Sequence, residues 1–289
     1  MSIPLPYEEN VTLALYSTFG IGGPARYLVK IKTMDDAEQL VLFCHQNRIP
    51  LLTIGKGSNC LFNDNGYNGI VAVNQINHFK QQENEFVVGS GFSFSLLGIK
   101  TASLGYKGLE FAAAIPATVG GAVFMNAGSG GRETFNFLKE VIYINEKGER
   151  QVFQKKDLSF GYRTSSFQNK KGMIVEATFS LTTCLEAKGW QKENIAYRIK
   201  TQPYKDKSAG CAFQNPNKDF SAGKLIESCG LKGYQIGGAK VSEIHANFVV
   251  NTGSATAKDV LLLIEYIREK VWEKHKIRLE NEIKMIGYE

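Results

Sequence analysis

The sequence predicts an α+β protein in which helical segments flank a long middle region of short strands. Three observations support this prediction. A capped helical pattern occupies residues 33–49, apolar and alternating runs recur through residues 51–181, and a second capped helical pattern occupies residues 256–271. We find no internal repeat and no low-complexity tract.

Both helical patterns begin with the same capping signature. Thr33 is followed by Asp36 and Thr256 by Asp259, so each hydroxyl can accept a bond from the acidic residue's N–H while the carboxylate bonds back. Pro50 ends the first pattern because proline cannot continue a helix. The apolar positions at helical spacing are Ala37, Leu40, Val41 and Cys44 in the first segment, and Val260, Leu263, Ile264, Ile267 and Val271 in the second.

Strand signals dominate the region between these helices. Leu51–Ile54 predicts a buried strand that leads directly into Gly55. Asn145–Gly148 predicts a hairpin turn, and Gly105 should end a helix over residues 93–104. The other predicted strands are 69–74, 85–89, 141–144, 151–153 and 174–181.

The composition turns polar and charged over residues 185–207. Trp190 and Tyr197 are spaced as in a surface helix, which Gln202-Pro203 should end. We therefore expect a domain boundary near residue 200.

The charge pattern limits the class of partner. The chain has 289 residues, 43% of them hydrophobic and 21% charged, with a formal net charge of +6. The lysines and arginines are interspersed with acids, which argues against nucleic acid and leaves room for a small anionic ligand.

Neither a leader nor a metal centre is predicted. The start MSIPLPYEENVTL has no basic segment before an apolar one, and no run reaches the roughly 18 apolar residues of a membrane span. We therefore expect a cytoplasmic protein. The five cysteines form no C-x-x-C pair and the four histidines are dispersed, so we expect neither a disulfide framework nor a metal site.

The segment GKGSNCLF, residues 55–62, is the first candidate ligand-binding loop. In a Walker loop the lysine follows the last glycine, whereas Lys56 lies between two glycines. A dinucleotide fingerprint opens a helix, whereas residues 63–66 predict a turn. Neither standard phosphate-binding pattern therefore applies.

Physical chemistry still allows this loop to hold an anion. Gly55 and Gly57 can adopt positive φ, which lets backbone N–H groups converge on a diphosphate, and Ser58 and Asn59 can add side-chain donors. On this segment alone a plain β-turn is the more frequent explanation, because short glycine motifs have many false positives.

Residues 108–128 form the second candidate. This stretch is rich in Ala and Gly, follows neither helix nor strand periodicity, and can start a short helix at Pro116. Small residues allow the backbone to approach a large flat ligand closely. A tight helix–sheet contact explains the same composition equally well.

A series of sequence blocks covers nearly the whole chain: FGIGGP at 19–24, GKGSN at 55–59, IPATVGGAVFMNAG at 115–128, YRTSSF at 162–167, SAGCAFQNP at 208–216, SAGKLIESCGLKGYQIGGAKVSEIHANFVVN at 221–251 and LENEIKMIG at 279–287. In content and order they resemble the UDP-N-acetylenolpyruvoylglucosamine reductases (UDP-N-acetylmuramate dehydrogenases) of peptidoglycan synthesis. The length resembles the shorter form of that family.

The resemblance implies vanillyl-alcohol-oxidase-like (PCMH-type) FAD-binding domains plus a C-terminal α+β substrate-binding domain. The expected domains are FAD-binding subdomain 1 at 1–68, FAD-binding subdomain 2 at 69–199 and the substrate-binding domain at 200–289. It also implies noncovalent FAD, with Cys60 as the one nearby side chain able to form a tether. The implied FAD-binding residues are Gly55, Lys56, Gly57, Ser58, Asn59, Pro116, Thr118, Gly120, Gly121, Asn126 and Gly128.

The implied reaction reduces UDP-N-acetylglucosamine enolpyruvate to UDP-N-acetylmuramate. NADPH passes hydride to FAD, reduced FAD gives hydride to C3 of the enolpyruvyl group, and an acid protonates C2. Arg163 matches the residue that binds and polarises the substrate carboxylate, and Glu282 one that assists by a hydrogen bond or proton relay. Tyr162 and Asn215 match substrate-binding positions. We expect a monomer with no nucleic acid or membrane partner.

Position 211 departs from the pattern of many family members. They carry Ser as the proton donor, whereas this chain has Cys211. A thiol can also act as the acid, provided that it stays protonated until the carbanion forms. We therefore expect Cys211 to donate the proton to C2, activity to fall at high pH, and greater sensitivity to oxidants. We expect His245 to be structural or adjacent to substrate.

Two other functions remain open on the sequence. One is a different FAD-linked oxidoreductase on the same fold, against which the blocks around Cys211 and Glu282 argue. The other is a UDP-sugar-binding protein that has lost catalysis, against which the intact Arg163 and Glu282 argue.

Overall fold

The computed structural model describes residues 3–217 and 219–288, and its contacts divide the chain into two compact units. The first unit comprises the residues up to Glu9 together with Tyr27–Gly55 and Gly69–Tyr197. The second unit comprises Asn10–Arg26, Lys56–Asn68 and the residues from Arg198 onward.

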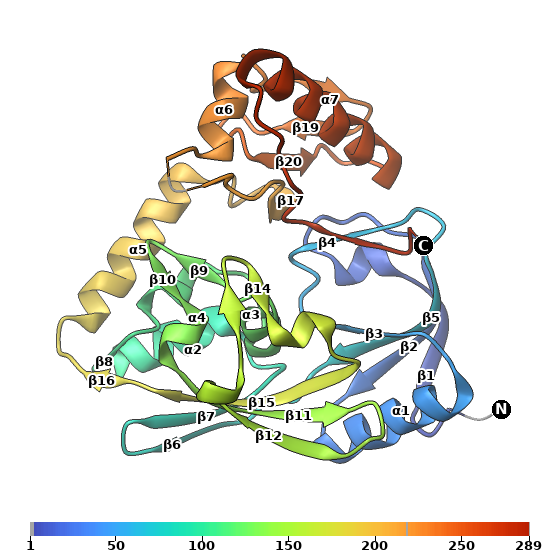
Figure 1. Ribbon diagram of the computed structural model, residues 1–289, viewed down its shortest axis with the longest axis vertical. Helices are drawn as coiled ribbons and strands as arrows, with labels where there is room; N and C mark the ends of the chain where they lie inside the picture. Colours follow the sequence, from blue (N-terminus) through green and yellow to red (C-terminus); the bar gives the residue numbers. More distant parts are fainter. Residues whose placement is uncertain (1–2, 218, 289) are drawn as a thin grey trace. The chain divides into compact units, whose positions relative to one another are not determined.

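The first unit is built on a five-stranded antiparallel sheet with the order β12-β11-β15-β7-β6 (Figure 1). Its register pairs Val141 with Ala177 and Phe179 with Phe86. The strands are β6 (Phe79–Gln82), β7 (Glu85–Gly89), β11 (Leu138–Asn145), β12 (Arg150–Gln154) and β15 (Gly172–Ser180).

Strand β15 contributes to two cores, because the register shift between its pairings with Ile142 and Tyr143 changes which of its side chains face each core. Met173 and Val175 belong to the core that includes α1 (Met34–Asn47). Ala177 and Phe179 belong to the core that includes α2 (Phe94–Ser103) and α3 (Val119–Phe124). Helices therefore pack on both sides of the sheet, with α2 and α3 on the same face (Figure 1).

Short elements complete the first unit. They are two strand pairs in hairpins, β9 (Gly128–Ser129) with β10 (Arg132–Glu133) and β13 (Phe160–Gly161) with β14 (Thr164–Ser165), the pair β8 (Tyr106–Lys107) with β16 (Thr182–Thr183), and α4 (Thr134–Phe137). Helix α5 (Ala187–Thr201) continues from this unit into the second.

A four-stranded sheet has the order β1-β2-β5-β3. Strands β3 and β5 are parallel, with Leu51 opposite Ile70. The strands are β1 (Tyr7–Thr12), β2 (Pro24–Ile31), β3 (Leu51–Ile54) and β5 (Tyr67–Asn74), and β1, β2 and β5 each pass from one unit into the other.

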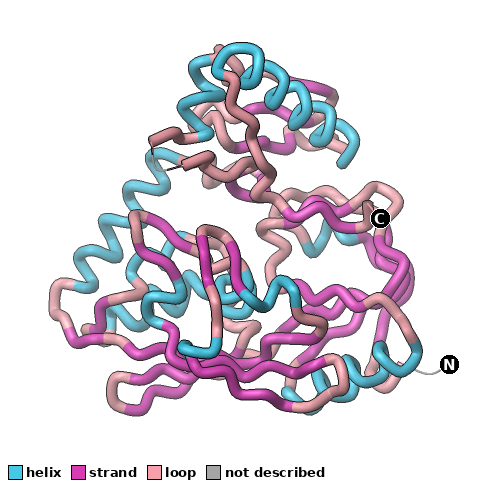
Figure 2. The backbone as a smooth tube through the Cα atoms, viewed as in Figure 1, coloured by secondary structure: helices cyan, strands magenta, loops and turns pink. Residues whose placement is uncertain are grey.

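The second unit combines an antiparallel sheet with two helices, and Figure 2 shows its helices in cyan and strands in magenta. The sheet order is β17-β20-β19-β18, and β4 pairs in parallel with β21. Their bounds are β4 (Cys60–Phe62), β17 (Lys207–Cys211), β18 (Gln235–Ile236), β19 (Ala239–Val241), β20 (Phe248–Asn251), β21 (Lys284–Ile286), α6 (Ala222–Ser228) and α7 (Ala257–His275).

Two N-terminal segments, Asn10–Arg26 and Lys56–Asn68, form hydrogen bonds with the C-terminal part of the second unit. The Thr18 hydroxyl donates to Ser208 O at 2.8 Å, and Asn251 Nδ2 donates to Phe19 O at 3.0 Å. The Asp64 carboxylate accepts bonds from the N–H groups of the first residues of α7, beginning with Ala257 at 2.8 Å. A carboxylate at a helix N-terminus satisfies otherwise unpaired N–H groups and opposes the helix dipole.

The predicted α+β class is confirmed, as are its main elements. Both capping boxes form, at Thr33 with Asp36 and at Thr256 with Asp259. The helix before Gly105, the strand before Gly55 and the hairpin between β11 and β12 all form where expected.

None of the helices within residues 3–217 and 219–288 combines the length and the apolar character that a membrane span requires. Within the same residues, no group of three or more His, Cys, Asp or Glu side chains is arranged to hold a metal ion.

Candidate active site

The two candidate ligand-binding stretches meet in the first unit at Gly55 and Thr118. A Cβ on Gly55 would lie 2.2 Å from Thr118 Oγ1 and 2.7 Å from its Cγ2, so only glycine fits there. Gly55 does not adopt the positive φ that its sequence predicts, and its role is close approach instead. The structure therefore brings together these two predicted FAD-binding residues.

Gly55→Ala is expected to weaken both folding and cofactor retention. The added methyl group must displace Thr118, at a cost of about 1 to 3 kcal/mol of unfolding free energy. Urea unfolding and the ratio of flavin to protein absorbance after gel filtration measure the two effects.

Gly189→Ala is the matched control, because no heavy atom lies within 4 Å of its added Cβ in α5. It should stabilise the helix by about 1 kcal/mol. Equal behaviour of the two variants would contradict the packing argument.

Thr118 is the N-cap of α3, where the sequence had placed Pro116 at the first helical position. The helix begins at Val119, and Thr118 Oγ1 accepts a bond from Gly121 N at 3.3 Å. Proline lies two residues earlier because an extended Thr118, at φ −93° and ψ 162°, must precede the first turn. Gly120 N donates to Ser90 O at 2.8 Å, which joins this stretch to the end of β7.

Asn126 holds the predicted cofactor-binding segment together from within. It is fully buried, and its Nδ2 donates to Glu133 Oε2 at 2.8 Å and to Gly161 O at 3.0 Å. Its Oδ1 accepts from Phe135 N at 3.0 Å. Both amide hydrogens are thereby used within the protein, so the side chain of Asn126 fixes the conformation of this segment. Gly128 follows at the start of β9, where a Cβ would lie 2.5 Å from Arg132 O.

Arg163 and Tyr162 form the turn of the β13–β14 hairpin. Arg163 has φ 58°, a left-handed conformation that costs a non-glycine residue about 1 to 2 kcal/mol. Its guanidinium lies 4.8 Å from the centre of the Tyr162 ring, and its Nη2 donates to Gly128 O at 3.4 Å. Tyr162 is 43% exposed. Strain at a residue with a predicted substrate role is typical of functional sites.

The remainder of the predicted diphosphate loop, Lys56 to Asn59, lies in the second unit. Gly57 has φ 59°, as predicted, and a Cβ there would lie 2.1 Å from Tyr16 O. Ser58 precedes Asn59, after which β4 begins at Cys60. The loop therefore leads from strand to strand without a helix, as the sequence indicated.

Cys60 is held as a thiol. Burial raises its pKa to about 11, against smaller opposing contributions from a backbone hydrogen bond at Asn59 and the charge of Lys284. A protonated thiol is a poor nucleophile. This chemistry fits noncovalent binding of a flavin.

Cys211 and Glu282 lie on neighbouring segments of the second unit. Cys211 ends β17, opposite Phe248 and after a register shift in the strand. Glu282 N donates to Ala212 O at 2.9 Å, and Phe213 and Asn281 form a β-bridge. A backbone hydrogen bond therefore joins Glu282 to the residue that follows Cys211, which places two of the three predicted catalytic residues on paired segments.

Asn215, the predicted substrate-binding residue, lies at the end of the same segment. Its Oδ1 accepts a bond from Ala222 N at 3.0 Å, at the start of α6. This bond ties Asn215 to the first residue of α6.

Sequence reasoning missed Asn247, which holds the segment after Cys211. Asn247 is 2% exposed, and its side chain pairs with both backbone groups of Phe213, accepting from N at 3.0 Å and donating to O at 2.8 Å. Its own carbonyl accepts from Ala212 N at 2.7 Å. The motif HANF lies within a block that resembles the reductase family, but nothing in the residue types indicated a backbone clamp.

Arg268 of α7 was also missed. Its Nε donates to Leu279 O at 3.1 Å and its Nη2 to Asn281 Oδ1 at 2.7 Å. Arg268 therefore fixes the chain just before Glu282. In the sequence it is one charged residue among many on the polar face of a helix.

His245 is neutral in the folded protein and contacts Asn247. Its Nδ1 accepts a bond from Asn247 N at 3.2 Å, and burial, followed by the positive charge of Lys232, lowers its pKa. A histidine whose pKa is lower in the folded protein stabilises the fold fully above its unfolded pKa of about 6.5. That stability is lost as the pH falls below this value.

His245→Asn is expected to reduce the loss of stability in acid, because an amide oxygen can accept the same bond without titrating. Thermal unfolding at pH 7.5 and pH 5.5 measures the effect. The melting temperature of the wild type should fall more between these values than that of the variant. Parallel losses would exclude His245 as the source.

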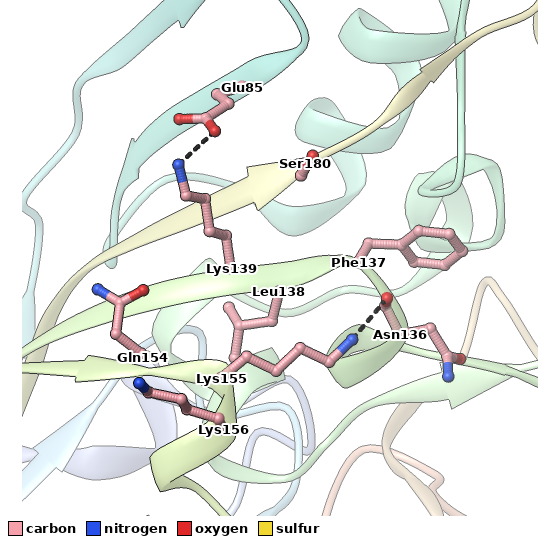
Figure 3. Close-up of a pocket in the computed structure, with 9 residues that line it drawn as sticks. All are labelled: Glu85, Asn136, Phe137, Leu138, Lys139, Gln154, Lys155, Lys156 and Ser180. Atoms are coloured by element: carbon pink, nitrogen blue, oxygen red, sulfur yellow. Dashed lines mark hydrogen bonds and ion pairs between the residues drawn. The ribbon is translucent and has the colours of Figure 1, made fainter.

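A surface hollow of about 640 Å³ lies elsewhere in the first unit (Figure 3). Two of its lysines already have partners: Lys139 pairs with Glu85, and Lys155 Nζ donates to Asn136 O at 3.0 Å. None of the predicted site residues lines it. Its full lining is Glu85, Asn136, Phe137, Leu138, Lys139, Gln154, Lys155, Lys156 and Ser180.

Comparison with known proteins agrees with these features. Residues 25–154 match the family model of the FAD binding domain, and residues 202–286 match that of the UDP-N-acetylenolpyruvoylglucosamine reductase C-terminal domain. The glycine cradle at Gly55 and Thr118 lies within the first match, and Cys211 and Glu282 lie within the second. The fold and site thus define an FAD-dependent oxidoreductase, and the predicted fold class is confirmed.

Full-length relatives identify the family. A UDP-N-acetylenolpyruvoylglucosamine reductase from Protochlamydia amoebophila is 52% identical and one from Chlamydia muridarum 46%, each match covering 100% of this chain and 97% of the relative. The crystal structure of the Thermus caldophilus reductase matches with a TM-score of 0.84 and 35% identity, over 98% of this chain and 100% of that one. The chain belongs to the UDP-N-acetylenolpyruvoylglucosamine reductase family.

Proposed function

We propose that this enzyme reduces UDP-N-acetylglucosamine enolpyruvate to UDP-N-acetylmuramate for peptidoglycan synthesis, with NADPH as reductant. The observation that best supports this proposal is the backbone pairing of the segment after Cys211 with the segment that carries Glu282. The proposal includes a monomeric, cytoplasmic enzyme and the three domains expected from the sequence.

The residues fit a bound FAD. Gly55 packs directly against Thr118, and Gly57, with its positive φ, packs directly against Tyr16, so the two glycines fix the shape of the loop that would hold the cofactor. Gly55 to Asn59 and Pro116 to Gly128 would hold it, and when bound it supplies the hydride chemistry of the reaction.

The protein's own groups would bind the substrate and supply its proton. The Arg163 fork binds the enolpyruvyl carboxylate and withdraws electron density from the double bond. Cys211 Sγ holds the proton that C2 receives, and the Glu282 carboxyl group assists by a hydrogen bond or proton relay. Tyr162 and Asn215 contribute to substrate binding.

An anaerobic two-step titration tests this proposal. The yellow holoenzyme should bleach near 450 nm on addition of NADPH and regain colour on addition of UDP-N-acetylglucosamine enolpyruvate. Bleaching without recovery would favour a different FAD-linked oxidoreductase. A preparation that binds the UDP-sugar but never bleaches would indicate lost catalysis.

A further inference from the structure

Asn59 makes two hydrogen bonds to the chain around Glu282. Its Nδ2 donates to Glu282 O at 3.1 Å, and its own carbonyl accepts from Lys284 N at 2.9 Å. These bonds flank Ile283, which is 3% exposed. The last residue of the GKGSN loop is therefore attached to both sides of one buried position.

The side chain of Asn59 adds a hydrogen bond to Glu282, which precedes β21 and is not paired with β4. The parallel pairing of β4 with β21 begins at Cys60 and Lys284, two residues after Glu282. The Asn59 amide reaches back to the Glu282 carbonyl, while the Glu282 N–H is bound to Ala212 O at 2.9 Å. Both backbone groups of Glu282 are thereby fixed, which restricts the direction of its carboxylate.

We infer that Asn59 is a positioning residue for Glu282 and couples the FAD-binding loop to it. The sequence assigned Asn59 only as a donor to the cofactor. The observed bonds give it a second task, in which ordering of the loop by FAD also orders the chain that carries Glu282. The catalytic part of this inference rests on the proposed function, because it assigns Glu282 a role in substrate reduction.

A double-mutant cycle separates this role from simple cofactor binding. Asn59→Ala, measured at saturating FAD, should slow reoxidation of the reduced enzyme by UDP-N-acetylglucosamine enolpyruvate about 10-fold, a typical effect of lost positioning. In a Glu282→Gln background the same change should slow it less than twofold, because coupled residues are not additive. Asn59→Asp, which keeps the size but loses the donor, should behave like Asn59→Ala.

Asn63→Ala is the matched control. Asn63 also forms a side-chain bond in this segment, accepting from Asn65 N at 2.8 Å, but that bond stays within its own turn. This variant should leave the reoxidation rate unchanged. An equal loss from Asn59→Ala in both Glu282 backgrounds, or a loss seen only in FAD affinity, would overturn the inference.

Hydrogen exchange provides a readout that does not depend on turnover. In the wild type, added FAD should slow exchange at the Glu282 amide about 10-fold, and in Asn59→Ala it should leave that exchange unchanged. The Lys284 amide is the internal control, because the main-chain carbonyl of Asn59 that binds it is present in both proteins. An equal FAD effect on the Glu282 amide in both proteins would also overturn the coupling. A wild type that never reoxidises would reject the proposed reaction, while the exchange experiment would still decide whether Asn59 couples the two segments.

Discussion

Cys211→Ala is expected to slow reoxidation of the reduced enzyme by its enolpyruvyl substrate about 10²- to 10⁴-fold, the range produced by loss of a general acid. Cys211 ends β17, next to Ala212, whose carbonyl receives the Glu282 N–H. Removing the thiol leaves the backbone bond between Glu282 and Ala212 in place and takes away the proposed proton donor. Bleaching by NADPH should therefore be preserved, and stopped-flow absorbance near 450 nm follows both steps.

Cys211→Ser is the control for the identity of the donor. A hydroxyl can also donate a proton, so this variant should reoxidise while Cys211→Ala does not. The wild type should lose activity at high pH as the thiol ionises, and the Ser variant should not show that decline. An alanine variant as fast as the wild type, or a flat wild-type profile from pH 7 to 10, would remove Cys211 from the mechanism.

Arg163→Gly is expected to make the protein more stable and the enzyme much slower. Glycine adopts φ 58° without the steric cost that arginine bears, so the unfolding free energy should rise by about 1 kcal/mol. If Arg163 binds the substrate carboxylate as proposed, loss of the guanidinium should reduce turnover at least about 100-fold, because the carboxylate is no longer oriented. Urea unfolding and steady-state kinetics measure these opposite changes.

Two controls separate strain from charge. Arg163→Lys keeps the strained backbone and the charge but loses the planar fork, so turnover should fall without a gain in stability. Arg48→Gly relieves φ 55° at the end of α1, so stability should rise without loss of turnover. A stable, fully active Arg163→Gly variant would show that this residue does not bind the substrate.

The elements that could be predicted from the sequence are those set by local rules. The capping boxes at Thr33 and Thr256, the Gly105 stop and the hairpin around Gly148 each depend on a few neighbouring residues. Secondary structure of this kind is encoded locally, so pattern reasoning finds it. The resemblance to the reductase family then identified the fold class, which the comparisons confirm.

The supports of the candidate site could not be predicted in this way. Asn59, Asn247 and Arg268 act through bonds to backbone groups between 11 and 223 positions away. An asparagine that clamps a distant carbonyl has the same local sequence signature as one in a surface turn. Only the folded arrangement shows which carbonyl each of these side chains meets.

The second unit is assembled from separate stretches of the sequence, which affects the order in which the chain can fold during synthesis. Residues 10–26 and 56–68 pack with residues that follow Arg198, and β4 pairs with β21 at the far end of the sequence. During translation, residues 10–26 and 56–68 can pack into the second unit only after the residues that follow Arg198 have been synthesised. Products truncated before residues 284–286 lack the partner strand of β4, so we expect them to leave the predicted FAD-binding loop incomplete and to be isolated without flavin.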